Sequence, residues 1–195
     1  MTRLRSSILP LSLLATSFIP LACGGSTSSP PAVCADLENY TPTSTSQLSF
    51  ATDVYPILTN TSGTGSGCAQ AGACHGADAL AINAAGTKLP FIFGTAAAPM
   101  MDPAMAKAQL LTASVNAPGM QRVLPGSVKN SFMAYKLASM DVPASKEALS
   151  CISGMCKANA SVGTPPCGDP MPTIGKLSAA DRTKILDWIA SGASD

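Results

Sequence analysis

The stretch Gly67-Cys68-Ala69-Gln70-Ala71-Gly72-Ala73-Cys74-His75-Gly76 holds two of the seven cysteines of this 195-residue chain and its single histidine. A run dominated by Thr, Ser and Gly precedes it, from Thr59 to Gly67, and predicts a loop that delivers Cys68. Because the chain has no other histidine, any site that needs a cysteine beside a histidine must lie here.

The pair Cys74-His75 forms the second half of the C-x-x-C-H signature for covalent haem attachment. The first half departs from that signature, because Ala71 stands where a cysteine is needed and the nearest upstream cysteine is Cys68. With five residues between them, Cys68 and Cys74 can also form a disulfide. Two interpretations therefore stay open, a covalently attached haem and a disulfide alone.

Composition limits the class of protein. Charged residues make up 12% of the chain, aromatic residues 5%, and the net charge is +1, which predicts no nucleic-acid surface. Alanine supplies much of the apolar share, so we expect a small core supported by disulfides, a cofactor or both. One histidine, without clustered carboxylates or a Ser-His-Asp grouping, predicts that the protein is not an enzyme.

The N-terminus predicts where the protein resides. Residues 1–22 combine two early arginines with an apolar segment, Ile8 to Ile19, that is too short to span a membrane. The following Leu21-Ala22-Cys23-Gly24-Gly25 resembles a bacterial lipobox, apart from Pro20. We expect a signal peptide over 1–22 and lipidation of Cys23. This predicts a lipid-anchored envelope protein, with Gly24 favouring the outer membrane and the domain in the periplasm or at the cell surface.

Cysteine usage suits that oxidising compartment. Residues 23–47 are rich in Ser, Thr and Pro and predict a tether, and 48–195 then form the domain. Cys34 interrupts the tether, so we expect a disulfide that pins it to the domain. After Cys23, an even set of six cysteines remains, which can pair completely as three disulfides. The candidates are Cys34, Cys68, Cys74, Cys151, Cys156 and Cys167, the last three in a stapled loop.

Three helical segments are predicted. The first spans Leu48 to Thr59, with Ser49 as its cap and Pro56 forcing a kink or a restart. The second runs to about Met140, with Ser127 or Asn130 as its cap.

The third helix begins after Ser178, a serine cap with an acidic residue three positions later, and ends at Gly192. Asp181 and Asp187 on this helix are interpreted as solvated.

Four features in order carry a resemblance to a known family. They are Phe50-x-x-Asp53-Val54-x-Pro56-Ile57-Leu58, Cys74-His75-Gly76, Met171-Pro172 and a last helix with Trp188-Ile189. Together they resemble the c-type cytochromes, in particular long bacterial members. The resemblance implies a mainly α fold, a small helical domain with long, irregular, disulfide-stapled loops, in which the first and last helices pack across each other.

The resemblance also implies a site for one haem c. Cys74, with Cys68 as the second sulfur, would attach the haem, and His75 and Met171 would be the two axial ligands of the iron. Such a ligand pair suits electron transfer, with a redox protein as a possible partner. The alternative, motivated by Ala71 and the even set of cysteines, is a haem-free, disulfide-stapled binding or structural module derived from that scaffold.

Overall fold

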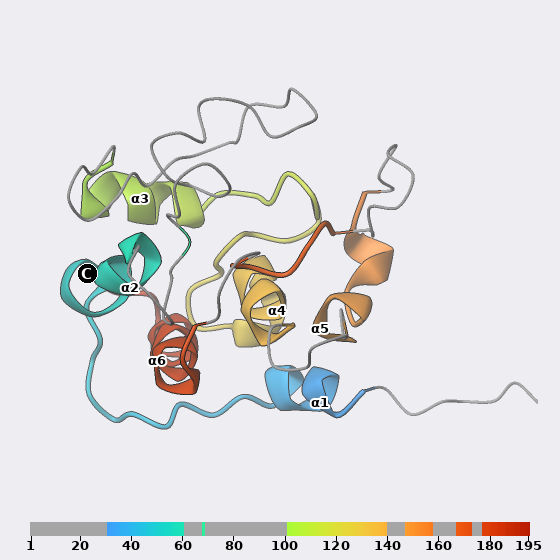
Figure 1. Cartoon of the computed structure of the whole chain (residues 1–195), viewed down its shortest axis with the longest axis horizontal. Coiled ribbons are helices and arrows are strands. Elements are labelled where there is room, and N and C mark those ends of the chain that lie inside the picture. Colours follow the sequence, from blue (N-terminus) through green and yellow to red (C-terminus); the bar gives the residue numbers. More distant parts are fainter. Residues whose placement is uncertain (1–30, 61–67, 69–100, 140–146, 158–166, 173–176) are drawn as a thin grey trace, which may run out of the picture.

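The computed structural model describes residues 31–60, 68, 101–139, 147–157, 167–172 and 177–195 (Figure 1). Within these residues the protein is mainly helical, as predicted, and contains no β-strand. The helices are α1 (Ala32–Glu38), α2 (Tyr55–Thr59), α3 (Pro103–Leu110), α4 (Phe132–Ala138), α5 (Glu147–Ser150) and α6 (Ala179–Ala190), with short turns η1 (Phe50–Val54), η4 (Val128–Asn130) and η5 (Ser153–Met155). A helix long and apolar enough to cross a bilayer does not occur among the described residues.

The helices enclose one apolar core. α4 lies in the middle of the molecule, with α6 on one side and α5 on the other (Figure 1). α1 contacts α4 and α5 along one edge, whereas α3 covers η1 along the opposite edge. The first predicted helix and the last one pack against each other, since η1 contacts α6.

Two aromatic rings make the central contact of this crossing. Phe50 and Trp188 are both fully enclosed, and their ring centroids lie 5.1 Å apart at 41°. The indole Nε1–H of Trp188 donates to the backbone oxygen of Ser194 at 2.8 Å, so its polar atom is satisfied inside the core.

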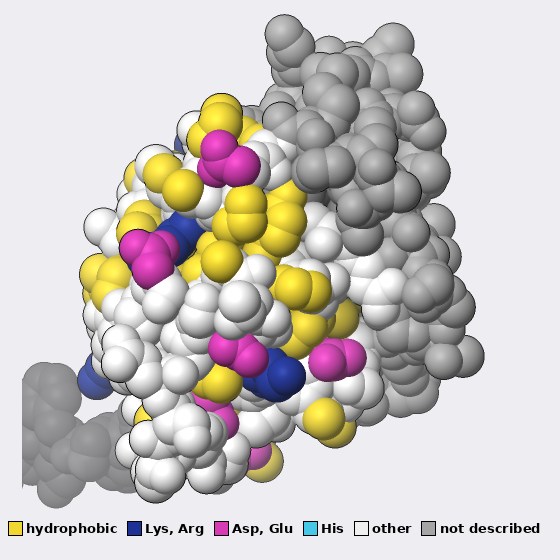
Figure 2. All heavy atoms as spheres, turned by 90° about the vertical axis from the view of Figure 1, so that its left-hand side faces the viewer, with side chains coloured by type: hydrophobic (Ala, Val, Ile, Leu, Met, Phe, Trp, Pro, Cys, Tyr) yellow, Lys and Arg dark blue, Asp and Glu magenta, His cyan; other side chains and the backbone are white. Residues whose placement is uncertain are grey.

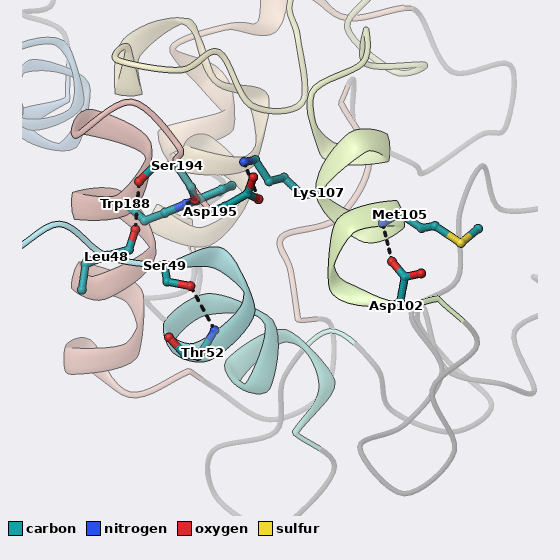
Figure 3. A network of polar contacts seen from close by, with 9 residues as sticks. All are labelled: Leu48, Ser49, Thr52, Asp102, Met105, Lys107, Trp188, Ser194 and Asp195. Atoms are coloured by element: carbon teal, nitrogen blue, oxygen red, sulfur yellow. Dashed lines mark hydrogen bonds and ion pairs between the residues drawn. The ribbon is translucent and has the colours of Figure 1, made fainter.

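The C-terminal residues join the two helices. Ser194 accepts from the backbone N–H of Phe50 at 3.2 Å, and its hydroxyl donates to the backbone oxygen of Leu48 at 3.1 Å. Figure 3 shows Ser194 between Leu48 and Trp188, with the Lys107–Asp195 ion pair at 2.7 Å beside them. Asp195 is almost fully exposed, so this ion pair contributes little to stability.

The first helical segment forms as its sequence predicts. The Ser49 hydroxyl accepts from the Thr52 N–H, which caps the start (Figure 3). Proline has no N–H to donate, and the chain changes from the π-helical turn η1 to α2 immediately before Pro56. The predicted restart at Pro56 is therefore confirmed.

The last helix is also confirmed. The Ser178 hydroxyl accepts from the Asp181 N–H at 3.0 Å and donates to the Asp181 carboxylate at 2.8 Å. Gly192 follows the helix with φ +106°, which a residue with a Cβ rarely adopts. The two ends of α6 are thus set by local chemistry.

The predicted cap of the second helix is wrong. α4 begins after Ser131, and neither Ser127 nor Asn130 accepts from its first turn. The Ser131 hydroxyl accepts from the Leu124 N–H and donates to the Ser127 carbonyl, both within the preceding loop. The backbone groups of a buried loop have no helical partners, so side-chain hydroxyls such as that of Ser131 satisfy them.

Two disulfides are present in the described part of the chain. Cys34 of α1 bonds to Cys151, which closes a sequence separation of 117 residues, and Cys156 bonds to Cys167 over a separation of 11. The predicted attachment of Cys34 to the domain is confirmed, and so is the stapled loop around Cys156.

The interpretation of Asp187 as a solvated residue is wrong. Its side chain is buried, with an exposed fraction of 3%. The Tyr40 hydroxyl donates to one carboxylate oxygen at 2.7 Å, joined by the Thr43 N–H at 2.9 Å. The Thr43 hydroxyl and the Ser44 N–H donate to the other oxygen at 2.7 and 3.0 Å. Residues 40–44, which lie within the predicted tether, are therefore attached to α6.

These contacts shift two pKa values. Burial raises the pKa of Asp187, but the hydrogen bonds from Thr43, Tyr40 and Ser44 outweigh it, so the pKa lies below its ordinary value. Burial, followed by the hydrogen bond to Asp187, raises the pKa of the Tyr40 hydroxyl. We call the contact between Asp187 and residues 40–44 the clamp. In it the carboxylate is ionised and the phenol of Tyr40 is neutral.

Replacing Phe50→Ala should lower the free energy of unfolding by about 3–5 kcal/mol, because it removes a buried ring from the helix crossing. Urea denaturation followed by Trp188 fluorescence measures this. Met105→Ala is the control, since this side chain is 54% exposed and its loss should change stability by less than ~0.5 kcal/mol. A similar, small effect of both substitutions would contradict the central place of the ring contact.

Replacing Asp187→Asn should destabilise the protein by roughly 2 kcal/mol at neutral pH, because an amide N–H₂ replaces an acceptor among several donors. A carboxyl with a lowered pKa stabilises the fold above its unfolded pKa of about 3.9, and this contribution is lost as pH falls further. The stability difference between wild type and variant should therefore shrink below about pH 4. Denaturation across pH, with exposed Asp36→Asn as the control, tests it; a difference independent of pH would refute it.

Candidate functional site

The predicted haem-attachment stretch lies mostly outside the described residues. Cys74, His75 and Ala71 belong to residues 69–100, as Cys23 belongs to residues 1–30, and their expected roles stay predictions. Cys68 is described, and it is buried, with an exposed fraction of 5%, in the same apolar core as Phe50 and Trp188. Cys68 is therefore a core residue, six positions before Cys74 in the sequence.

Met171 lies on a short segment, residues 167–172, that is attached to α4. The Met171 N–H donates to the backbone oxygen of Lys136 at 3.2 Å, and its side chain is half-buried. Pro172, joined to Met171 by a cis peptide bond, is buried. The Cys156–Cys167 disulfide attaches the beginning of the same segment.

Lys136 makes the second attachment of this segment. Its side chain is buried, with an exposed fraction of 4%, and its Nζ donates to the backbone oxygen of Asp169 at 2.5 Å. The same ammonium lies 5.3 Å from the centroid of the Phe132 ring, within the range of a cation–π contact. A buried lysine therefore holds the backbone two residues before Met171.

Gly168 leaves room for this ammonium. Its φ is +72°, and a Cβ added there would stand 3.3 Å from the Lys136 Nζ. A side chain in this backbone conformation would be strained and would crowd the ammonium, so glycine suits the position. The residues around Met171 are thus arranged to fix the segment at the C-terminal part of α4.

One described face of the molecule shows how its charged and hydrophobic side chains are distributed. Figure 2 shows the side of the molecule that bears α2 and the C-terminus, where hydrophobic side chains gather between single acidic and basic groups. Met105 of α3 is among the most exposed large hydrophobic residues. Scattered charges around apolar surface suit a weak contact with another protein better than a strong electrostatic one.

In the part of the chain that the structure describes, there is no group of three or more His, Cys, Asp and Glu side chains able to hold a metal ion. Of the predicted ligands, this search covers neither His75 nor Cys74.

Sequence reasoning named Met171 but assigned no role to Lys136 or to the clamp at Asp187. Both are charged groups in contact with backbone atoms far away in the chain, 33 residues away for Lys136 and 144 for Asp187 with Thr43. A periodicity within one helix contains no signal for such contacts.

Comparison with known proteins adds no relative. No protein-family model, curated protein or solved structure matches the chain.

Replacing Lys136→Met should release the segment around Met171, because the hydrogen bond from the ammonium to the Asp169 carbonyl is lost. We expect the Met171 amide hydrogen to exchange roughly tenfold faster, the effect of losing one charge-assisted hydrogen bond. Hydrogen exchange resolved by mass spectrometry measures this. Lys129→Met, a change at an exposed lysine of the same region, should leave the exchange unchanged. Equal exchange in both variants would show that Lys136 does not hold the segment.

Proposed function

We propose that this chain is a lipid-anchored protein of the bacterial cell envelope whose domain, residues 48–195, binds one haem c and transfers electrons. One observation carries the proposal. The first helical segment packs on α6 through Phe50 and Trp188, and Met171-Pro172 is attached to α4, which precedes α6 in the chain. The resemblance to c-type cytochromes implies the first of these, the packing of the first helical segment on the last one.

Two of the proposed haem donors, Met171 and Cys68, lie among the described residues. Met171 offers a thioether from a half-buried segment with three attachments, the Cys156–Cys167 disulfide, Lys136 and the α4 backbone. Cys68, six positions before Cys74 in the sequence, is buried in the core. In this proposal Cys74 and Cys68 hold the haem covalently, and His75 and Met171 are the axial ligands.

When bound, a haem with an imidazole and a thioether ligand exchanges single electrons without opening a site for oxygen. The residues of the chain position the thioether ligand and exclude water. The attachments of residues 167–172 hold the thioether donor in place before any ligand binds, which lowers the ordering cost of ligation. The core around Phe50 and Trp188 excludes water. An electron carrier of this kind is not an enzyme and needs a redox protein as its partner.

The location is proposed from the N-terminus. Residues 1–22 serve as a lipoprotein signal peptide, and Cys23 carries the lipid that attaches the protein to a membrane, with the outer membrane favoured. The domain then lies in the periplasm or at the cell surface. Two disulfides in the described residues support an oxidising compartment.

A second function, a haem-free binding or structural module, is favoured by cysteine pairing. Of the six cysteines that remain after Cys23, four form the two disulfides, Cys34–Cys151 and Cys156–Cys167. The remaining two are Cys68 and Cys74. A third disulfide between them would complete the set and leave no thiol for a haem.

Expression of the chain together with a cytochrome c assembly system separates the two functions. The haem proposal predicts a covalent haem that survives a denaturing gel and an absorption spectrum that sharpens on reduction. His75→Ala and Met171→Ala should both alter the spectrum, whereas Met105→Ala, at an exposed methionine, should not.

Mass spectrometry of the intact chain and of its peptides detects the opposite outcome. A chain without the added mass of haem, and with a peptide that contains Cys68 joined to Cys74, would refute the haem proposal. That same result would establish the disulfide-stapled module.

A further inference from the structure

The length of free chain between the proposed lipid anchor and the domain is shorter than the Ser/Thr/Pro-rich composition of residues 23–47 suggests. Residues 32–47, which we call the strap, are attached to the domain at both ends and in the middle. Cys34 is bonded to Cys151, the carboxylate of Asp187 binds residues 40–44, and the Leu48 backbone that follows accepts from Ser194.

The attachments are chemically independent of one another. The disulfide connects α1 to the residue that follows α5, whereas the carboxylate belongs to α6. Leu37 adds an apolar contact, since it is buried in the main core. The strap can therefore lift only if a covalent bond, a buried hydrogen-bond network and an apolar contact are all lost.

This arrangement sets how far the domain can move from the membrane. From Cys23 to Ala32 the chain advances nine residues, a stretch rich in Gly and Ser that ends in two prolines. Nine residues span at most ~30–32 Å and on average about 15–18 Å. If the strap were loose up to Leu48, 25 residues would span at most ~83–90 Å and on average about 25–30 Å.

We infer that the strap holds the domain close to the bilayer, with the edge formed by α1 and α5 nearest to the lipid. The inference rests on the proposed lipidation of Cys23. α1 leads directly from the linker and lies along the edge of the molecule opposite α3 (Figure 1). The α3 side, which carries exposed Met105, consequently faces away from the membrane.

The strap restrains the domain without making it adsorb to lipid. α1 has the sequence Ala-Val-Cys-Ala-Asp-Leu-Glu, so its exposed charges are Asp36 and Glu38 and it contains no basic residue. An acidic edge is repelled by anionic headgroups, which attract only Lys and Arg. Covalent length, rather than surface attraction, therefore sets the distance.

Energy transfer from the domain to labelled lipid tests this in the lipidated full chain. A donor dye is attached through a clickable amino acid at Glu147 of α5 or at Met105 of α3, both exposed. The protein is placed in vesicles of phosphatidylethanolamine and phosphatidylglycerol that carry an acceptor on the headgroups. Transfer should be higher from position 147 than from position 105.

Two variants lengthen the free chain by different means. A Gly/Ser insertion of about 15 residues between Ser29 and Pro30 leaves the domain unchanged and brings the average reach to about 25–29 Å. Combining Cys34→Ala, Leu37→Ala, Cys151→Ala and Asp187→Asn removes all three kinds of attachment and gives nearly the same free length. Transfer from position 147 should fall by roughly a factor of two in both, since both raise the average reach by a factor of about 1.6.

The outcomes are separable. Equal transfer from the two positions, or unchanged transfer after the insertion, overturns the inference. So does a folded strap-release variant that keeps the transfer of wild type; if that variant does not fold, the insertion decides. A chain that does not float with vesicles and lacks lipid mass at Cys23 overturns the anchor and the inference together. A lipidated chain with unaffected transfer overturns the inference alone.

Discussion

The contact between the Phe50 and Trp188 rings is the interaction on which the rest of the structure depends. Aromatic residues are only 5% of the chain, so two rings buried against each other supply an unusually large part of its apolar packing. The contact joins the two ends of the domain, 138 residues apart in sequence. Ser194 then bonds to the backbone of Leu48 and Phe50 on one side of the contact and accepts from the indole N–H of Trp188 on the other. These bonds satisfy polar groups that the burial would otherwise leave unpaired.

A core of this size explains the use of covalent links. In the chain-entropy account a disulfide stabilises more as the closed loop lengthens, by on the order of 4–5 kcal/mol for a loop of ~100 residues and about 3 for a short one. Cys34–Cys151 is of the first kind and Cys156–Cys167 of the second. Each also has a local effect, because the first attaches the strap and the second begins the segment that carries Met171. Stability and placement of the candidate ligand therefore come from the same bonds.

Local chemistry predicted the ends of the domain well. Ser49, Pro56 and Ser178 act on backbone groups within one turn, so their effects can be read from neighbouring residues. The prediction of the cap of α4 was wrong because Ser131 bonds to a buried loop, and the course of that loop depends on tertiary packing. α1 and α3 were not predicted at all. α1 lies in a Ser/Thr/Pro-rich stretch, and its disulfide and the burial of Leu37 attach it to the domain.

Asp187 shows where reasoning from one helix ends. Asp187 lies between Leu186 and Trp188, and its position on the helix alone predicts an exposed side chain. The residues that cover it come from the other end of the chain. Two hydroxyls and two backbone N–H groups donate to it. In the sequence, the residues that carry these donors resemble those of an ordinary linker. Composition describes residues 40–44 as a spacer, whereas one buried carboxylate makes them part of the domain. The same pairing logic applies to Lys136 and the segment before Met171, since a buried charge organises a loop that has no periodicity of its own. In a chain with few charges, the buried ones determine which irregular segments belong to the fold.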